Sequence, residues 1–216
     1  MKVFVIGLWR ESTLRQTRPT QKILSLMVDL HQRIKNIITM KMARVHSKAV
    51  KKVAIFGKPG GGKTTLAKKL SNIHKIDHFP LDLIEYTYSG DRVNREEFLQ
   101  AHKELIVKEN WVIDGLGVLQ AFWDRIEAAD TVIYIDLPYR THYWWVIKRY
   151  LKSFYRKPEG WPEGSSVWRG TIASWKYLNL SRNFWTPELF ESIRERAGGK
   201  NLIHITRVRQ LDSLSQ

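Results

Sequence analysis

Eight consecutive residues have the types and spacing of a phosphate-binding loop: Gly57-Lys58-Pro59-Gly60-Gly61-Gly62-Lys63-Thr64. They follow a short apolar run over residues 53–56 and precede a predicted helix over residues 64–70, which is the context that this pattern requires. Backbone N–H groups of such a loop converge on phosphate oxygens, its lysine reaches the β and γ phosphates, and the hydroxyl after it offers a ligand to Mg²⁺. We therefore expect ATP and Mg²⁺ to bind through Gly57, Pro59, Gly60, Gly61, Gly62, Lys63, Thr64 and Thr65.

Three aspartates stand where predicted strands end, the edge at which parallel sheets bind ligands. Asp114 is predicted to hold Mg²⁺ together with Thr64; the alternative is a cap on the helix that follows Val118. Asp82 is predicted on the acceptor side, where a carboxylate orients or deprotonates a hydroxyl; the alternative is a turn aspartate. Asp136 is interpreted as a strand exit that caps the next helix rather than as a ligand.

A long insertion over residues 139–183 carries nine Lys/Arg, two Glu and five Trp, and it predicts a helix, a turn and a helix that form a basic lid over the site. Guanidinium groups can bind two phosphate oxygens at once. We expect two of its arginines to reach phosphate, Arg149 and Arg182 before Arg156 and Arg169. The tryptophans are predicted to form the core of the lid rather than base-stacking platforms, at Trp144, Trp145, Trp168 and Trp175.

Five strands alternate with helices, which predicts an α/β fold with a parallel sheet and right-handed crossovers. The strands are expected over residues 53–56, 76–81, 111–113, 131–135 and 201–205, with a helix over 95–108. Residues 51–216 are predicted to form one catalytic domain. Residues 1–50 carry ten Lys/Arg against two acids and are predicted as a basic N-terminal extension, partly helical or disordered. This extension is either an appendage, a start misplaced ahead of Met40 or Met42, or a helix that contacts a membrane.

Composition narrows the possible chemistry. The 216 residues include no cysteine, which excludes disulfides, thiolate zinc sites and a cysteine nucleophile. No apolar run approaches the roughly 20 residues that span a bilayer, so we expect a soluble, cytoplasmic protein. The net charge is +15, and residues 51–216 carry +7 of it (26 Lys/Arg against 19 acids), which suits a protein that handles polyphosphate. Nucleic acid is a possible partner for the basic lid and arm. The residue pattern does not specify an oligomeric state.

Residues 51–206 resemble the adenylate-kinase-like P-loop kinases, and within them a bacterial branch named for DNA topology modulation. The resemblance rests on the loop, Leu81-Asp82, the run that ends in Asp114-Gly115, residues 129–138 and Lys148-Arg149. It implies a nucleoside monophosphate kinase core with strand order 2-3-1-4-5 and a mobile lid. The chain departs from the pattern at two places: Leu116-Gly117-Val118 stands where adenylate kinases have Phe-Pro-Arg, and Trp145 stands where relatives often have arginine.

Two functions remain open on the sequence. The first is a phosphotransferase that moves the γ-phosphoryl of Mg-ATP to a small acceptor, a nucleotide, nucleoside or similar compound, with Lys63, Asp82, Arg149 and Arg182 as its catalytic residues. The second is a nucleotide-dependent, nucleic-acid-binding regulatory protein with weak ATPase activity. Both departures weigh against a nucleoside monophosphate as the acceptor.

Overall fold

The computed structural model describes residues 50–87, 91–156 and 166–214, together with residues 26, 28–30 and 32. Its contacts divide the chain into two units, Met1–Ala43 and Arg44–Gln216. Within the first unit the described residues are helical, and the rest of the N-terminal helical spacing lies outside the described residues. None of the helices within these ranges combines the length and apolar character needed to cross a membrane.

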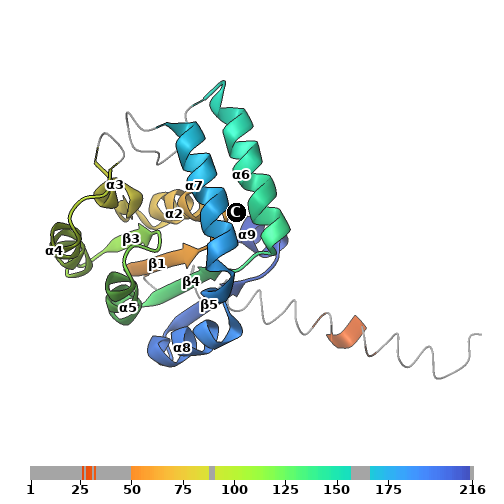
Figure 1. Cartoon of the computed structure of the whole chain (residues 1–216). Coiled ribbons are helices and arrows are strands. Elements are labelled where there is room, and N and C mark those ends of the chain that lie inside the picture. Colours follow the sequence, from red (N-terminus) through yellow and green to blue (C-terminus); the bar gives the residue numbers. More distant parts are fainter. Residues whose placement is uncertain are drawn as a thin grey trace, which may run out of the picture. The chain divides into compact units, whose positions relative to one another are not determined.

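The second unit is built on a five-stranded parallel sheet in the order β2-β3-β1-β4-β5 (Figure 1). The central strand β1 pairs with β3 on one side and with β4 on the other. The outer strands β2 and β5 pair with β3 and β4 respectively. The strands are β1 (Lys52–Gly57), β2 (His78–Pro80), β3 (Trp111–Asp114), β4 (Thr131–Ile135) and β5 (Asn201–Ile205).

Helices cover both faces of this sheet. A core cluster lies where α4 (Arg95–Ile106), α5 (Leu119–Ala128) and α8 (Pro187–Ala197) pack on one face, and it includes ring contacts of Phe56 with Phe122 and Tyr134. On the other face α2 (Lys63–His74) buries Leu66, Ala67 and Leu70. The short α9 (Val208–Ser213) buries Leu211 and follows β5. Alternate residues of each strand therefore serve opposite faces, as expected for a sheet covered on both sides.

Local sequence explains where several helices begin and end. The Asn94 side chain accepts a hydrogen bond from the Glu96 backbone N–H and so caps α4. Thr186 caps α8 in the same way, Pro187 occupies its first turn, and Gly198 ends it with φ 48°. Asp114 does not cap α5, whose N-cap is Val118 without a side-chain cap. Asp136 does not cap the helix that follows β4 either, because its N-cap is Pro138.

The lid consists of α6 (Tyr139–Ser153) and α7 (Val167–Leu180), followed by the 3-10 turn η1 (Ser181–Asn183). The two helices lie side by side and extend beyond the carboxyl edge of the sheet (Figure 1). Tyr143 donates a hydrogen bond to Asn179, and Arg149 donates one to Ser174 across 2.9 Å, which joins the pair. The turn-rich residues 157–164 lie outside the described residues.

Candidate active site

The glycine-rich loop passes from β1 into the N-terminus of α2 through positions that only glycine can occupy. A Cβ on Gly57 would lie 2.2 Å from the carbonyl oxygen of Ile135, and one on Gly60 would lie 2.8 Å from Val146 Cγ2. Both residues have positive φ, as does Gly62, which begins α2 without a side-chain cap. The first N–H groups of α2 therefore lack a capping side chain, and a helix N-terminus of this kind favours bound phosphate.

Lys63, the first residue of α2, lies within the loop. Its Nζ donates a hydrogen bond to the carbonyl oxygen of Lys58 across 3.0 Å. Burial lowers the pKa of its ammonium group, and the carboxylates of Asp82 and Asp114 oppose that shift. Lys63 is thus close enough to both acids to interact with their charge, and it is held in the loop that would surround the phosphates.

Thr64 in the first turn of α2 contacts Asp114 at the end of β3. Thr64 Oγ1 donates a hydrogen bond to Asp114 Oδ2 across 2.7 Å, and His78 Nε2 lies 2.6 Å from the other carboxylate oxygen. Hydroxyl and carboxylate oxygens are ligands that Mg²⁺ accepts, and Mg²⁺ is usually held by one or two protein groups plus substrate phosphates. The donor set fits that mode. No group of three or more acidic, histidine or cysteine side chains within the described ranges forms a metal site by itself.

A buried arginine supports the loop that follows Asp114. Arg125 Nη2 donates hydrogen bonds to the carbonyl oxygens of Gly115 and Leu116, across 2.7 and 3.3 Å. Burial lowers its pKa to about 10, so it remains charged near neutral pH. This contact fixes the backbone beside the carboxylate, where the sequence has Leu116 in place of the phenylalanine of adenylate kinases.

Asp82 is brought next to Asp114 by the pairing of β2 with β3. Pro80 is in register with Asp114, and the Leu81 backbone N–H donates to the Asp114 carbonyl oxygen across 2.9 Å. Asp82 begins the four-residue helix α3 (Asp82–Glu85). Its surface reaches solvent, yet enough protein surrounds it that burial raises its pKa, against the opposing charge of Lys63. Asp82 is therefore an exposed carboxylate that lies close to Lys63, Asp114 and Arg149.

The two predicted lid arginines lie in different surroundings. Arg149 is close enough to Asp82 and Lys63 to affect the pKa values of both, and burial lowers its own pKa. Arg182 is exposed and lies over the Tyr139 ring, 5.2 Å from its centroid. The structure thus brings together Lys63, Thr64, Asp82, Asp114 and Arg149, and it leaves Arg182 with Tyr139.

A buried ion pair beside the loop was not anticipated from the sequence. Lys58 is only 2% exposed, and its ammonium group binds the Asp136 carboxylate and lies 4.9 Å from the centroid of the Tyr139 ring. His204 Nε2 lies 3.2 Å from the second oxygen of Asp136. Burial disfavours the charged carboxylate, but the contacts with His204 and Lys58 outweigh it and lower the pKa of Asp136 to about 2. A single lysine in a loop carries no pattern that predicts this pair.

The lid is attached to the loop through a second unanticipated residue. His142 of α6 is fully buried, and its Nδ1 lies 2.9 Å from the carbonyl oxygen of Pro59. A Cβ on Gly61 would lie 3.0 Å from His142 Cε1. Burial lowers the pKa of His142 to about 4, so it is neutral near pH 7. The first half of α6 therefore packs directly on the phosphate-binding loop.

The prediction that the lid tryptophans form its core is wrong for three of them. Trp144, Trp168 and Trp175 are 59%, 55% and 41% exposed. Two of these make ring contacts between the lid helices: Trp168 lies 5.2 Å from Tyr150 and Trp175 lies 4.8 Å from Tyr143. A two-helix lid on a sheet edge is too thin to bury large rings, since each helix has one side in water.

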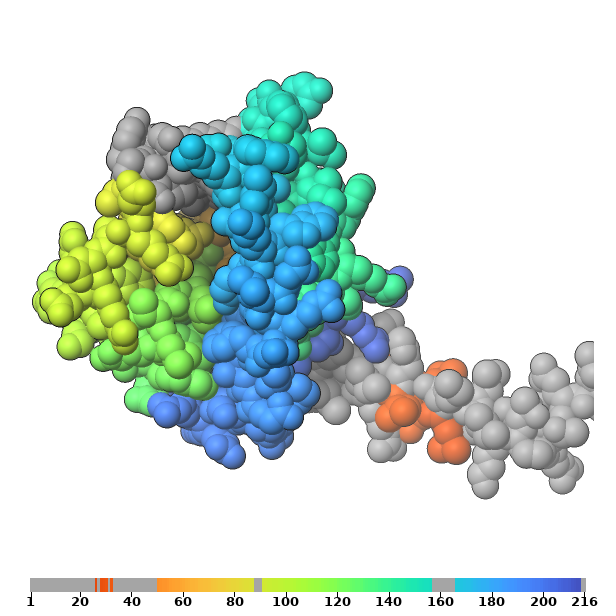
Figure 2. All heavy atoms as spheres, viewed as in Figure 1, coloured from red at the N-terminus to blue at the C-terminus, as the bar shows by residue number. Residues whose placement is uncertain are grey.

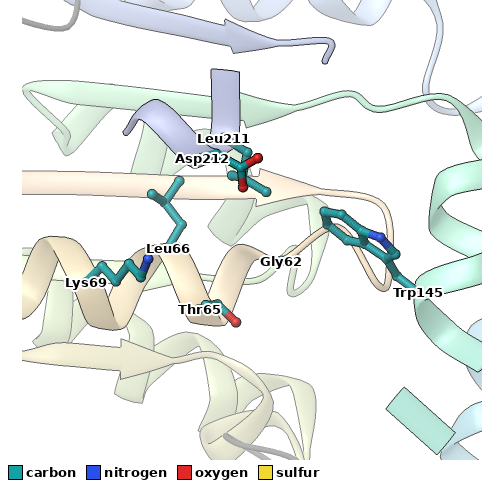
Figure 3. Close-up of a pocket in the computed structure, with 7 residues that line it drawn as sticks. All are labelled: Gly62, Thr65, Leu66, Lys69, Trp145, Leu211 and Asp212. Atoms are coloured by element: carbon teal, nitrogen blue, oxygen red, sulfur yellow. The ribbon is translucent and has the colours of Figure 1, made fainter. Parts of the chain in front are cut away.

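The fourth tryptophan lines a pocket that adjoins the loop (Figure 3). The pocket has a volume of about 260 Å³, with Trp145 on α6 facing it from one side and residues of α2 and α9 from the other. An indole face offers a stacking surface, and the carboxylate and ammonium groups at the wall offer polar contacts. Its lining consists of Gly62, Thr65, Leu66, Lys69, Trp145, Leu211 and Asp212.

The topology and the loop together determine the fold class. A parallel sheet in the order 2-3-1-4-5, a phosphate-binding loop after β1 and a helical insertion after β4 occur in one chain. The fold is that of a P-loop NTPase with a nucleoside monophosphate kinase-like core.

No protein-family model matches the chain. No curated protein matches it either. Among solved structures it is similar to a shikimate kinase from Acinetobacter baumannii in complex with shikimate, with a TM-score of 0.44, 14% sequence identity, and coverage of 76% of this chain and 89% of that chain.

Proposed function

We propose that the chain is an adenylate-kinase-like P-loop kinase that transfers the γ-phosphoryl group of Mg-ATP to a small acceptor. The observation that carries the proposal is the Thr64–Asp114 hydrogen bond at the N-terminus of α2, beside Lys63 and Asp82. Phosphoryl transfer uses groups of these kinds close together: a hydroxyl, a carboxylate, an ammonium group and uncapped N–H groups of a helix N-terminus. The resemblance at Asp82, Asp114-Gly115 and Lys148-Arg149 supports the branch named for DNA topology modulation.

The proposed roles follow from these positions. Backbone N–H groups of the loop and of Thr65 would hold the phosphates, with Lys63 on the β and γ oxygens. Thr64 and Asp114 would hold Mg²⁺, which when bound neutralises negative charge on the phosphate oxygens. The pocket beside Trp145 would take the base. In this arrangement the protein contributes mainly positioning and charge.

The acceptor would lie beside Asp82. The raised pKa of this carboxylate makes it a better proton acceptor than an ordinary aspartate, which supports a hydroxyl-bearing acceptor such as a nucleoside or sugar. Asp82 would orient the hydroxyl and take its proton as the oxygen attacks phosphorus. Arg149, which is electrostatically coupled to Asp82, would hold charge on the transferred group or on the acceptor.

The test is a transfer assay with the purified full chain, labelled ATP and panels of nucleosides, nucleoside monophosphates and sugars. We expect one panel to accept label, and Lys63→Ala to reduce that transfer by about 10³-fold or more while the circular dichroism spectrum is unchanged. The matched control is Lys103→Ala, which removes an exposed lysine from α4, distant from the loop in the fold. Transfer by Lys63→Ala at the control rate would contradict the proposal. ATP-dependent binding of nucleic acid without transfer to any panel would favour the regulatory alternative.

A further inference from the structure

The lid has an outer face that is not used by the proposed reaction. On α6 this face consists of residues spaced so that they share one side of the helix: Arg140, Trp144, Lys148, Leu151 and Lys152. All five are exposed. The opposite side of α6 carries His142 and Val146, which pack on the phosphate-binding loop. The outer face therefore points away from the candidate site.

The neighbouring helix continues the same composition. On α7 exposed apolar residues alternate with exposed cations, at Trp168, Arg169, Ile172, Lys176 and Leu180. Trp168 and Trp175 remain partly exposed while packing on Tyr150 and Tyr143 of α6, so the seam between the helices is aromatic. Figure 2 shows side chains of α7 and of the adjacent α6 standing at the surface of the described unit. We use the term outer lid face for these exposed residues of α6 and α7.

The charge of this face has one sign. The two helices contain six Lys/Arg and no Asp or Glu, so no acid within either helix neutralises its cations. Five of the six belong to the outer lid face, and the sixth is Arg149 of the candidate site. The phosphate-binding loop lies on the other side of α6, where His142 and Val146 pack on it. A polyanionic partner outside the chain is the electrostatically matched occupant.

The apolar residues of the outer lid face indicate which class of polyanion fits it. Tryptophan together with exposed leucine and isoleucine, interleaved with lysine and arginine, is the composition of helices that lie in a membrane interface. Single-stranded nucleic acid would use the cations and the ring faces, but it would leave Leu151, Ile172 and Leu180 in water. A second copy of the same face would bring cation against cation.

We propose that the outer lid face docks on an anionic lipid surface. The aromatic and aliphatic side chains would enter the headgroup region, and the lysines and arginines would bind phosphate headgroups. Such contact needs no change in the phosphate-binding loop, because that loop packs on the opposite side of α6.

The test is sedimentation of the full chain with vesicles of phosphatidylcholine alone and of phosphatidylcholine mixed with phosphatidylglycerol. We expect salt-sensitive binding to the mixed vesicles and a blue shift of tryptophan emission on binding. Trp144→Gln/Lys148→Gln removes one apolar and one cationic side chain four residues apart, and it should weaken binding by about tenfold or more. The matched control at the C-terminal end of α4 is Lys103→Gln/Val107→Gln, also an exposed cation and an exposed apolar residue four apart, and it should bind as the unaltered chain does.

Several results would overturn the proposal. Equal binding to both kinds of vesicle would remove the role of headgroup charge. Unchanged binding by Trp144→Gln/Lys148→Gln would assign the affinity to another part of the chain. If this variant instead loses binding to an oligodeoxythymidine while its vesicle binding is unaffected, the face binds nucleic acid. Loss of a dimer in sedimentation velocity, without any vesicle binding, would make it a contact between copies.

Discussion

Thr64 and Asp114 are 50 positions apart in the sequence, and their side chains meet in a 2.7 Å hydrogen bond at the N-terminus of α2. Asp114 is the last residue of β3, and Thr64 lies in α2, which the phosphate-binding loop connects to β1. Strands β1 and β3 are neighbours in the parallel sheet. The pairing of these strands therefore builds the proposed Mg²⁺ site.

Asp114→Asn should weaken the dependence on Mg²⁺ while preserving the shape of the site. The amide keeps an oxygen near Thr64 but removes the negative charge, so we expect half-maximal turnover to need at least about tenfold more Mg²⁺. The measurement is a magnesium titration of phosphoryl transfer, with ATP binding followed separately. A titration curve that overlays that of the unaltered chain would show that Asp114 acts only through its hydrogen bonds to Thr64 and His78.

Asp82→Asn and Arg149→Gln should separate the two classes of acceptor. For a hydroxyl acceptor, Asp82→Asn should lower kcat by about 10²-fold with little change in KM for ATP, because the lost step is proton removal. In the unaltered chain, kcat should fall in acid as Asp82 is protonated, and burial raises the pKa of that carboxylate above its ordinary value of 3.8. The plot of kcat against pH should lose this fall in Asp82→Asn. For a monophosphate acceptor, Arg149→Gln should be the costly change and Asp82→Asn the mild one. Transfer to monophosphates that survives Asp82→Asn would contradict the hydroxyl-acceptor proposal.

Asp136→Asn should destabilise the fold. It leaves the ammonium group of Lys58 buried without its carboxylate, so we expect the free energy of unfolding to fall by about 3 kcal/mol at neutral pH. Lys58→Met in the same chain should restore much of that loss, since it removes the buried charge. Urea denaturation of both single variants and the double variant measures the coupling.

The Lys58–Asp136 ion pair should make the free energy of unfolding depend on pH in acid. The pKa of Asp136 is lowered to about 2, so its contribution is complete above the ordinary aspartate pKa of 3.8 and is lost as the pH falls toward 2. Unfolding free energies of Asp136→Asn and the unaltered chain should therefore converge at the acid end of that window. A constant difference across it would show that the variant acts through packing alone.

His102→Leu should reduce the loss of stability in mild acid. His102 is fully buried on α4, and burial together with the charge of Arg125 lowers its pKa to about 4 from 6.5. Between these values the unfolded chain binds a proton that the folded chain does not, so stability falls as the pH drops from 6.5 to 4. The shift corresponds to about 3 kcal/mol for this residue. Denaturation at both ends of the window should show a smaller difference for the variant than for the unaltered chain.

His142→Leu supplies the comparison for that experiment, since His142 has a similarly lowered pKa of about 4. Each histidine should account for part of the acid sensitivity, because they lie in different parts of the unit, on α4 and α6. If His102→Leu retains the full pH dependence, protonation of His102 is not coupled to unfolding.

Features that depend on local pattern could be predicted from the sequence. The phosphate-binding loop, the parallel sheet and the strands at residues 131–135 and 201–205 follow from apolar runs, glycine spacing and alternation with helices, whereas the strand order was implied by the resemblance to adenylate-kinase-like kinases. The helix α8 was overlooked although its start has a recognisable signature, a threonine cap followed by Pro187. The short helices α3 and α9 have too few residues to show a period.

The sequence predicted that Thr64 and Asp114 lie together, but three other contacts between distant residues could not be predicted. Lys58 meets Asp136 across 78 positions, His142 meets Pro59 across 83, and His78 meets Asp114 across 36. Each depends on the register of neighbouring strands or on the packing of α6, and a single lysine or histidine has no spacing that reveals it. The exposure of Trp144 was missed for a related reason, because residue type alone does not say which side of a helix meets water.

His142 and Val146 hold the first half of α6 against the phosphate-binding loop, so a rotation of the helix about this contact would move its far end the most. At about 1.5 Å per residue, Ser153 lies about 17 Å along the helix axis from His142. A tilt of about 5° at the loop would then displace the far end by about 1.5 Å. Small adjustments of the loop around phosphate would thus be amplified at the end of α6, and a load on the outer side of the helix would be transmitted back to the loop.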